Sequence, residues 1–204
     1  RTALSGDRVD HEGPSFRIHA QLGFTPVRRR PPIVLGVKGE QALKMAAQHA
    51  DGLLLSILSS PDYVRWVRGQ VGPGHELSAY VAVSTHDDPA VARDRLRPTV
   101  AKYLGVHGDH AITRTAGLDP DKARAFREGW TSGAPRVDLV DDELLDTFAV
   151  AGSSDDAAAA LARYARAGLD VAVVRDDPGI DPDTALRAAR DVHRRSLTTA
   201  QPAR

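Results

Sequence analysis

The sequence predicts an α/β fold in which parallel strands alternate with helices, and three observations support this prediction. Short apolar runs recur along the chain at 33–35, 53–58, 77–84 and 171–174. These runs are nearly continuous rather than alternating, which is typical of parallel strands buried on both faces. An amphipathic helical pattern follows each run. Four such strands fit either a small doubly wound sheet or half of a (β/α)8 barrel, a fold of about 250 residues.

The composition narrows the class of protein. The 204 residues include 27 Lys and Arg against 27 Asp and Glu, and this balance argues against a general nucleic-acid or acidic-membrane binder. The sequence contains no cysteine, which excludes disulfides and thiolate metal sites. No apolar run approaches the roughly 20 residues of a membrane span. We therefore expect a cytoplasmic protein without a nucleic-acid or membrane partner.

The first residues are predicted to lie outside the main sheet. Arg1 to Ser5 resembles the last turn of a helix that ends at Gly6. Residues 9–18 place a Glu-Gly-Pro turn between two short extended pieces. The chain starts with Arg1 rather than methionine, which predicts a trimmed chain or a fragment.

The stretch 31–60 has the size and pattern of a minimal strand–helix–strand unit. After the strand at 33–35 comes the loop Gly36-Val37-Lys38-Gly39, and then a helix at 40–50. Such a loop places backbone amides and a helix N-terminus at the carboxyl end of a parallel strand, which attracts phosphate and other anions. Its spacing is neither that of a Rossmann loop nor that of a Walker A loop. Two glycines would equally serve a tight turn without a ligand.

The rest of the chain carries clear helix starts. Ser60-Pro61 begins a helix, and Asp88-Pro89 begins another that reaches about Leu104 and that Pro98 should kink or split. Residues 105–137 are predicted to be an insertion. Further helices are predicted at 120–129, 141–148, 153–167 and 181–192, and a flexible tail at 196–204.

Residues 107–110, His-Gly-Asp-His, are of metal-ligating types. They lack the further ligands at the fixed spacing that a zinc site uses. No metal site is therefore predicted.

Several segments resemble the luciferase-like monooxygenase superfamily. Residues 31–55, PPIVLGVKGEQALKMAAQHADGLLL, match its pattern of two prolines, an apolar strand, a glycine loop, an apolar helix and an Ala-Asp-Gly strand. Residues 4–13, 150–153 and 167–170 are similar to further segments of the family. The most similar subgroup comprises coenzyme F420-dependent oxidoreductases similar to methylenetetrahydromethanopterin reductase. The similarity is weakest across 105–137.

The resemblance implies that residues 1–204 form one luciferase-like domain, the carboxyl-terminal half of a (β/α)8 TIM barrel with about four parallel strands. It implies hydride transfer between F420, or alternatively FMN, and a small organic substrate. The implied cofactor-binding residues are Gly36, Val37, Lys38, Gly39 and Ser56.

Two further residues at predicted strand ends, Arg175 and Ser59, are candidates for binding a substrate or an anion. The catalytic residues stay unassigned, because the resemblance places them mostly in the amino-terminal half of the family fold.

Two alternatives stay open. The chain could be a non-catalytic barrel half that pairs with another chain, or a phosphate-binding barrel lyase or isomerase. The second would usually carry a lysine or a carboxylate pair on strand ends, whereas we find only Lys38, in a loop. Unpaired sheet edges predict self-association or pairing with an amino-terminal barrel half, and no turnover by the isolated chain.

Overall fold

The computed structural model describes residues 1–24, 26–28, 30–175, 189–190 and 194. They belong to two compact units, residues 1–34 and 35–204, which we describe separately. The predicted helix at 181–192, apart from residues 189 and 190, and the predicted tail at 196–204 lie outside the described residues.

The first unit contains a short 3-10 helix and a hairpin. The 3-10 helix η1 (Ala3–Ser5) ends at Gly6, whose φ of 91° places it in the left-handed region. Strands β1 (Val9–Glu12) and β2 (Arg17–Ala20) pair antiparallel. The predicted helix end and the two predicted extended pieces are therefore confirmed.

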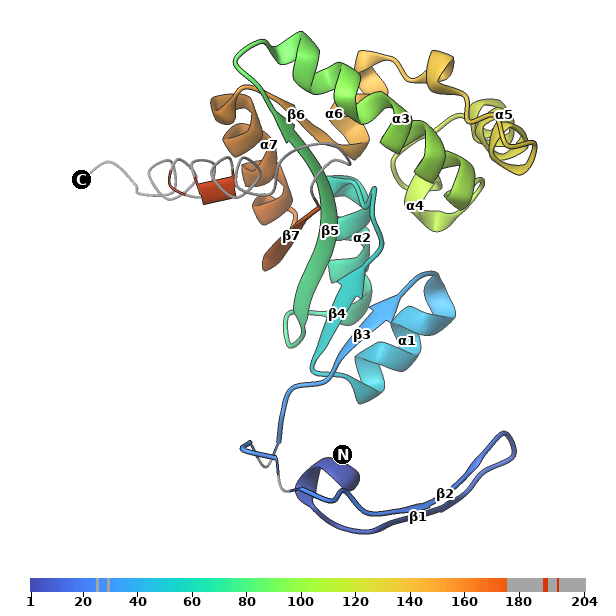
Figure 1. The fold of residues 1–204 in the computed structure, drawn as a ribbon, viewed down its shortest axis with the longest axis vertical. Helices are drawn as coiled ribbons and strands as arrows, with labels where there is room; N and C mark the ends of the chain where they lie inside the picture. The colour runs from blue at the N-terminus through green and yellow to red at the C-terminus, as the bar shows by residue number, and fades with distance from the viewer. Residues whose placement is uncertain (25, 29, 176–188, 191–193, 195–204) are drawn as a thin grey trace. The chain divides into compact units, whose positions relative to one another are not determined.

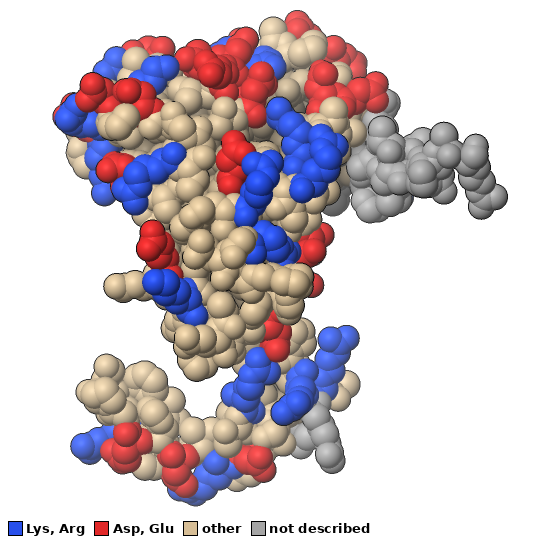
Figure 2. All heavy atoms as spheres, turned by 180° about the vertical axis from the view of Figure 1, so that it is seen from behind, with Lys and Arg blue, Asp and Glu red and all other residues tan. Residues whose placement is uncertain are grey.

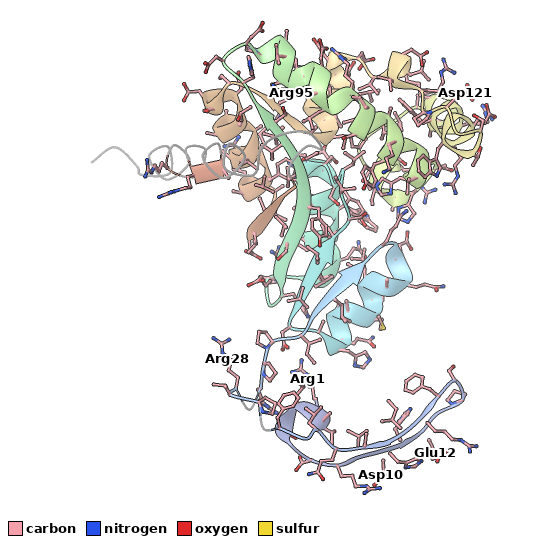
Figure 3. All side chains as sticks on the ribbon, in the orientation of Figure 1. Arg1, Asp10, Glu12, Arg28, Arg95 and Asp121 are labelled. Atoms are coloured by element: carbon pink, nitrogen blue, oxygen red, sulfur yellow. The ribbon has the colours of Figure 1, made fainter. Side chains whose placement is uncertain are left out.

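One face of the hairpin carries a histidine between two carboxylates. Asp10 and Glu12 project from the same side of β1 (Figure 3), and the two ring nitrogens of His19 lie 2.9 Å from an oxygen of each. Within the described part of the chain, no group of three or more His, Cys, Asp or Glu residues is placed to hold a metal ion.

The second unit alternates strands and helices, as predicted (Figure 1). Its first part consists of β3 (Val34–Val37), α1 (Glu40–His49), β4 (Gly52–Leu55), α2 (Pro61–Val71), β5 (Glu76–Thr85) and α3 (Pro89–His107). Its second part consists of α4 (Ala111–Arg114), α5 (Pro120–Thr131), η2 (Val137–Leu139), α6 (Asp142–Phe148), β6 (Val150–Gly152), α7 (Ser154–Arg166) and β7 (Val171–Arg175). No helix among the described residues is long and apolar enough to cross a membrane.

The sheet is organised around β5. Its neighbours run in the order β3-β4-β5-β6, and β7 also pairs with β5. Strands β4, β6 and β7 are each parallel to β5, with β7 along residues 78–82 and β6 along residues 83–85. The predicted parallel α/β fold is confirmed, and the described sheet is open, as expected of part of a barrel. The three-residue strand β6 was not predicted.

Helices cover one face of this sheet (Figure 1). Alternate β5 residues Leu77, Ala79 and Val81 join the core formed with α1, α2 and α7. On the opposite face, Tyr80 and Val171 are each 40% exposed. A second core cluster forms where α3 packs on α5 and α6. The opposite face is therefore exposed at Tyr80 and Val171, whereas Ser78 and Ala82 on the same face are buried.

Three element boundaries differ from the prediction. Strand β4 ends at Leu55 rather than at residue 58, because Leu58 has a φ of 64° and cannot continue a strand. Strand β3 includes Gly36 and Val37, because Val37 is buried in the core and only 4% exposed. Helix α3 continues through Pro98 without splitting. It also passes Gly105, whose missing side chain lets α5 pack closely on α3. It ends instead at Gly108, whose φ is 57°.

Candidate functional site

The turn between β3 and α1 starts a helix without a capping side chain. Gly39 is the N-cap residue of α1, with φ 86° and ψ 162°, a conformation that is essentially restricted to glycine. Every other α-helix among the described residues has an N-cap side chain that accepts a backbone hydrogen bond. The first-turn amides of α1 are therefore left for another acceptor, and the helix dipole favours an anion there.

A buried hydroxyl lies against the backbone of this turn. Tyr63 of α2 is fully buried, and its hydroxyl has no hydrogen-bond partner among the described residues. Burial raises the pKa of Tyr63 to about 12, and the backbone of Gly39 opposes this change. Tyr63 is thus a neutral group that keeps its proton.

Two further predicted site residues, Ser56 and Ser59, follow the neighbouring strand β4. Ser56 follows β4 directly and is half-buried. After it, Leu58 adopts a φ of 64° although it is nearly fully buried, and such strain persists only where the surroundings enforce it. The hydroxyl of Ser59 donates to the Ser56 carbonyl at 2.7 Å, so its proton stabilises the turn.

His107, at the end of α3, connects that helix to the turn after β4. Its Nε2 donates to the carbonyl of Ile57 at 2.9 Å, and its Nδ1 is buried without a described partner. Burial lowers the pKa of His107 to about 4, against the bond to Ile57, and the nearby charges of Lys38 and His110 lower it further. His107 is therefore neutral at physiological pH.

His110 lies directly over the glycine turn. Its Nε2 is 3.5 Å from the position that a Cβ on Gly39 would occupy, and its ring centroid is 6.4 Å from that of His107. Burial lowers the pKa of His110, with smaller contributions from the charges of Lys38 and Arg114.

Lys38 completes a positively charged cluster. Burial and the charge of Arg127 lower the pKa of Lys38. Arg127 itself donates to the carbonyls of Gly105 and Val106 at the end of α3. The electrostatic field around Lys38 comes mainly from basic groups, whereas the face shown in Figure 2 carries intermingled acidic and basic side chains. Burial is the main reason why the pKa values of Lys38, His107 and His110 are lowered, and neighbouring positive charges lower them further. A bound anion would offset that repulsion.

The structure places most of the predicted site residues at the ends of the neighbouring strands β3 and β4. Gly36 and Val37 end β3, Lys38 and Gly39 form the turn, and Ser56 directly follows the neighbouring strand β4. The backbone of Arg175 ends β7, and its side chain is not described. Their role in cofactor binding stays a prediction.

Sequence reasoning missed Tyr63, His107 and His110 as parts of this site. Tyr63 carried no predicted functional role in the helix that begins at Ser60-Pro61, and the two histidines were considered only as metal ligands. Ile57 is 50 residues from His107, so no local pattern indicates their contact. The one available signal was the residue type of two histidines near the end of a helix.

The sequence model of the luciferase-like monooxygenase family matches residues 1–171, most of the chain. The protein belongs to this family, which confirms the predicted resemblance. The chain is 26% identical over 204 residues to 5,10-methylenetetrahydromethanopterin reductase of Archaeoglobus fulgidus, covering 92% of this chain and 60% of that protein.

Solved structures show the same fold. The coenzyme F420-dependent tetrahydromethanopterin reductase of Methanopyrus kandleri matches with a TM-score of 0.73 and 23% identity, over 98% of this chain and 60% of that one. An F420-dependent secondary alcohol dehydrogenase, solved with an F420–acetone adduct, matches with a TM-score of 0.67 and 14% identity, over 98% and 58%. The chain thus spans 60% of the length of the reductase relatives described here.

Proposed function

We propose that the protein is a coenzyme F420-dependent oxidoreductase acting on a small organic substrate, and that the turn from Gly36 to Gly39 binds the phosphate-bearing tail of the cofactor. The observation that carries the proposal is the start of α1 at Gly39 without a capping side chain, beside Lys38. Family membership and the names of the reductase and dehydrogenase relatives support the choice of F420.

The residues present fit an anionic tail. The fully buried hydroxyl of Tyr63 can donate a hydrogen bond and lacks a described partner, and an unpaired polar group of this kind is costly in a closed interior. Lys38 supplies a positive charge that is partly withdrawn from water. The set therefore combines backbone donors with a cation, the usual chemistry of phosphate recognition.

In this proposal each residue has a distinct role. The backbone of Gly39 and the first turn of α1 bind and orient the tail, and Lys38 neutralises its charge. Ser56, which directly follows the neighbouring strand β4, would contact the cofactor beside the turn. When bound, F420 supplies hydride chemistry at its deazaflavin ring, while the protein supplies position and electrostatics.

The test is a titration of the 204-residue chain with F420, followed by cofactor fluorescence. A deazaflavin that lacks the phosphate tail, and FMN, serve as parallel ligands. Charge-assisted hydrogen bonds contribute about 1.5–3 kcal/mol, so F420 should bind at least about tenfold more tightly than the tail-less ligand. Equal affinities would refute the role of the turn, and a preference for FMN would replace F420 by FMN in the proposal.

We further infer that this unit completes its active site by pairing with an amino-terminal barrel half. The exposed apolar side chains of Tyr80 and Val171, each 40% exposed on the same face of the sheet, support this inference. Barrel active sites are assembled from loops around the whole ring. Turnover should therefore require the amino-terminal half of a family member added in trans. A monomeric chain that turns over unaided would contradict this, and a stable homodimer would favour self-association instead.

A further inference from the structure

The His110 side chain presents one ring nitrogen to the glycine turn. His110 is the residue that precedes α4, and the backbone amide of Ile112 donates to its Nδ1 at 3.3 Å. The opposite ring nitrogen, Nε2, lies 3.5 Å from the place of a Cβ on Gly39. The imidazole therefore spans the distance between the start of α4 and the start of α1.

The contact at Nδ1 decides the tautomer. A nitrogen that accepts a hydrogen bond carries no proton, so in the neutral ring the proton must be on Nε2. No partner for this Nε2–H occurs among the described residues. His110 consequently offers a hydrogen-bond donor beside the uncapped amides of α1 even when it is uncharged.

The surroundings favour an anion at this point. Lys38 from the β3–α1 turn and Arg114 from α4 are the nearest cationic influences on His110, and Asp109 is the opposing carboxylate. Asp109 is paired with Arg114 at 3.1 Å. The hydroxyl of Tyr63 is a donor at the same turn, because it is fully buried, has no described partner and lies close enough to the Gly39 backbone to be influenced by it. This buried donor makes the turn more than a helix end alone.

We propose that His110 is a ligand-positioning residue that donates a hydrogen bond from Nε2 to the anionic group bound at the Gly36–Gly39 turn. The residues that follow α3 would thereby select ligands with a phosphate or a similar anion. The proposal rests on the proposed function for the identity of the cofactor, but its geometry concerns any phosphate-type anion at the turn.

The two ring nitrogens can be tested separately by substitution. His110→Gln places an amide N–H near the position of Nε2, whereas His110→Asn keeps an acceptor near the position of Nδ1 and removes the distal donor. His110→Asn thus preserves the start of α4, because asparagine is a good N-cap residue. Thermal unfolding of both variants identifies any loss of folding.

Affinity is measured for F420, for the tail-less deazaflavin and for inorganic phosphate. We expect His110→Asn to lose about tenfold in affinity for F420 and for phosphate, the effect of one hydrogen bond to a charged group. Its affinity for the tail-less ligand should be unchanged. His110→Gln should stay within about threefold of the unaltered chain for all three ligands, because it retains a donor.

The pH profile gives an independent readout. Burial lowers the pKa of His110, and protonation would place an N–H on Nδ1, where the Ile112 amide donates, so the neutral ring is the donor. The ratio of the phosphate affinities of the unaltered chain and His110→Asn should therefore be constant between about pH 7 and pH 8. Full affinity of a folded His110→Asn variant would overturn the proposal, and so would an equal loss for the tailed and tail-less ligands.

The proposed function can fail independently of this inference. If the unaltered chain binds phosphate but not F420, the identity of the cofactor is wrong, and the comparison of His110→Asn with His110→Gln on phosphate still decides the role of His110. If phosphate binding is absent as well, the turn is not an anion site, and the role of His110 is wrong too.

Discussion

The segment from Val34 to His49 and the segment 105–137 both contribute to the candidate site, but in different ways. The first contributes backbone: a strand end, the turn at Gly39 and the uncapped start of α1. The second contributes side chains, namely the two histidines and Arg127. Backbone geometry follows from local sequence, whereas the position of these side chains depends on how α3 packs on the rest of the unit. The backbone part of the site is thus determined by local sequence, and its side-chain part by tertiary packing.

The largest expected effect concerns His107, where the two regions are linked. Its pKa is about 4 in the folded chain, against about 6.5 for an exposed histidine. The unfolded chain therefore binds a proton first, so stability is full above about pH 6.5 and falls as the pH approaches 4. At about 1.4 kcal/mol per pKa unit, this histidine should remove about 3 kcal/mol of unfolding free energy by pH 4.

The measurement is urea unfolding of the chain and of His107→Gln between pH 7 and pH 4. Glutamine can still donate to the Ile57 carbonyl, but it does not titrate. The carboxylates of the two proteins titrate alike, so the difference between the curves reports His107. Parallel curves would show that His107 is not buried in its neutral form.

A second effect separates packing in the 105–137 segment from helix propensity. A Cβ on Gly105 would lie 2.5 Å from the Trp130 Cβ and 2.7 Å from the Phe126 carbonyl oxygen, whereas a Cβ on Gly69 of α2 would meet nothing within 4 Å. Overpacking costs about 1–3 kcal/mol, and alanine in a helix otherwise gains about 1 kcal/mol over glycine.

Because these two contributions oppose each other, Gly105→Ala should lower the unfolding free energy by about 1 kcal/mol and at most by about 2 kcal/mol, while Gly69→Ala should raise it by up to about 1 kcal/mol. Chemical denaturation of both variants checks this prediction. A Gly105→Ala variant as stable as Gly69→Ala would mean that α5 does not pack closely on α3.

These two regions also mark how far sequence alone could lead. Apolar runs predicted the main parallel strands, and Ser60-Pro61 and Asp88-Pro89 predicted the starts of α2 and α3, because a capping side chain and a proline act within a few residues. Gly105 was interpreted as the start of an insertion, yet it lies inside a helix. The role of this glycine depends on Trp130, which is distant in sequence and adjacent only after folding. The contact between His107 and Ile57 was unpredictable for the same reason.

The third effect tests the backbone contribution of the first region. Gly39 has φ 86° and ψ 162°, where a side chain costs about 1–3 kcal/mol. Gly36 does not have a positive φ, and a Cβ there would meet nothing within 4 Å. We expect Gly39→Val to weaken F420 binding by about tenfold or more, and Gly36→Ala to change it little. Equal effects of the two substitutions in the fluorescence titration would remove the basis for assigning Gly39 to the tail.

The smallest effect is electrostatic and concerns Lys38. Its side chain is exposed and its charge lies beside the start of α1, so it should increase the affinity for an anionic tail by a few-fold. Lys44 is the matched control, because it is an exposed lysine of the same helix and lies beyond its first turn. Interactions between exposed charges are screened over about 10 Å at 0.1 M salt. Lys38→Ala should therefore weaken F420 binding more at low salt than at high salt, whereas Lys44→Ala should change it little at either. A loss that does not depend on salt, or the same loss for Lys44→Ala, would mean that Lys38 acts through general surface charge rather than at the turn.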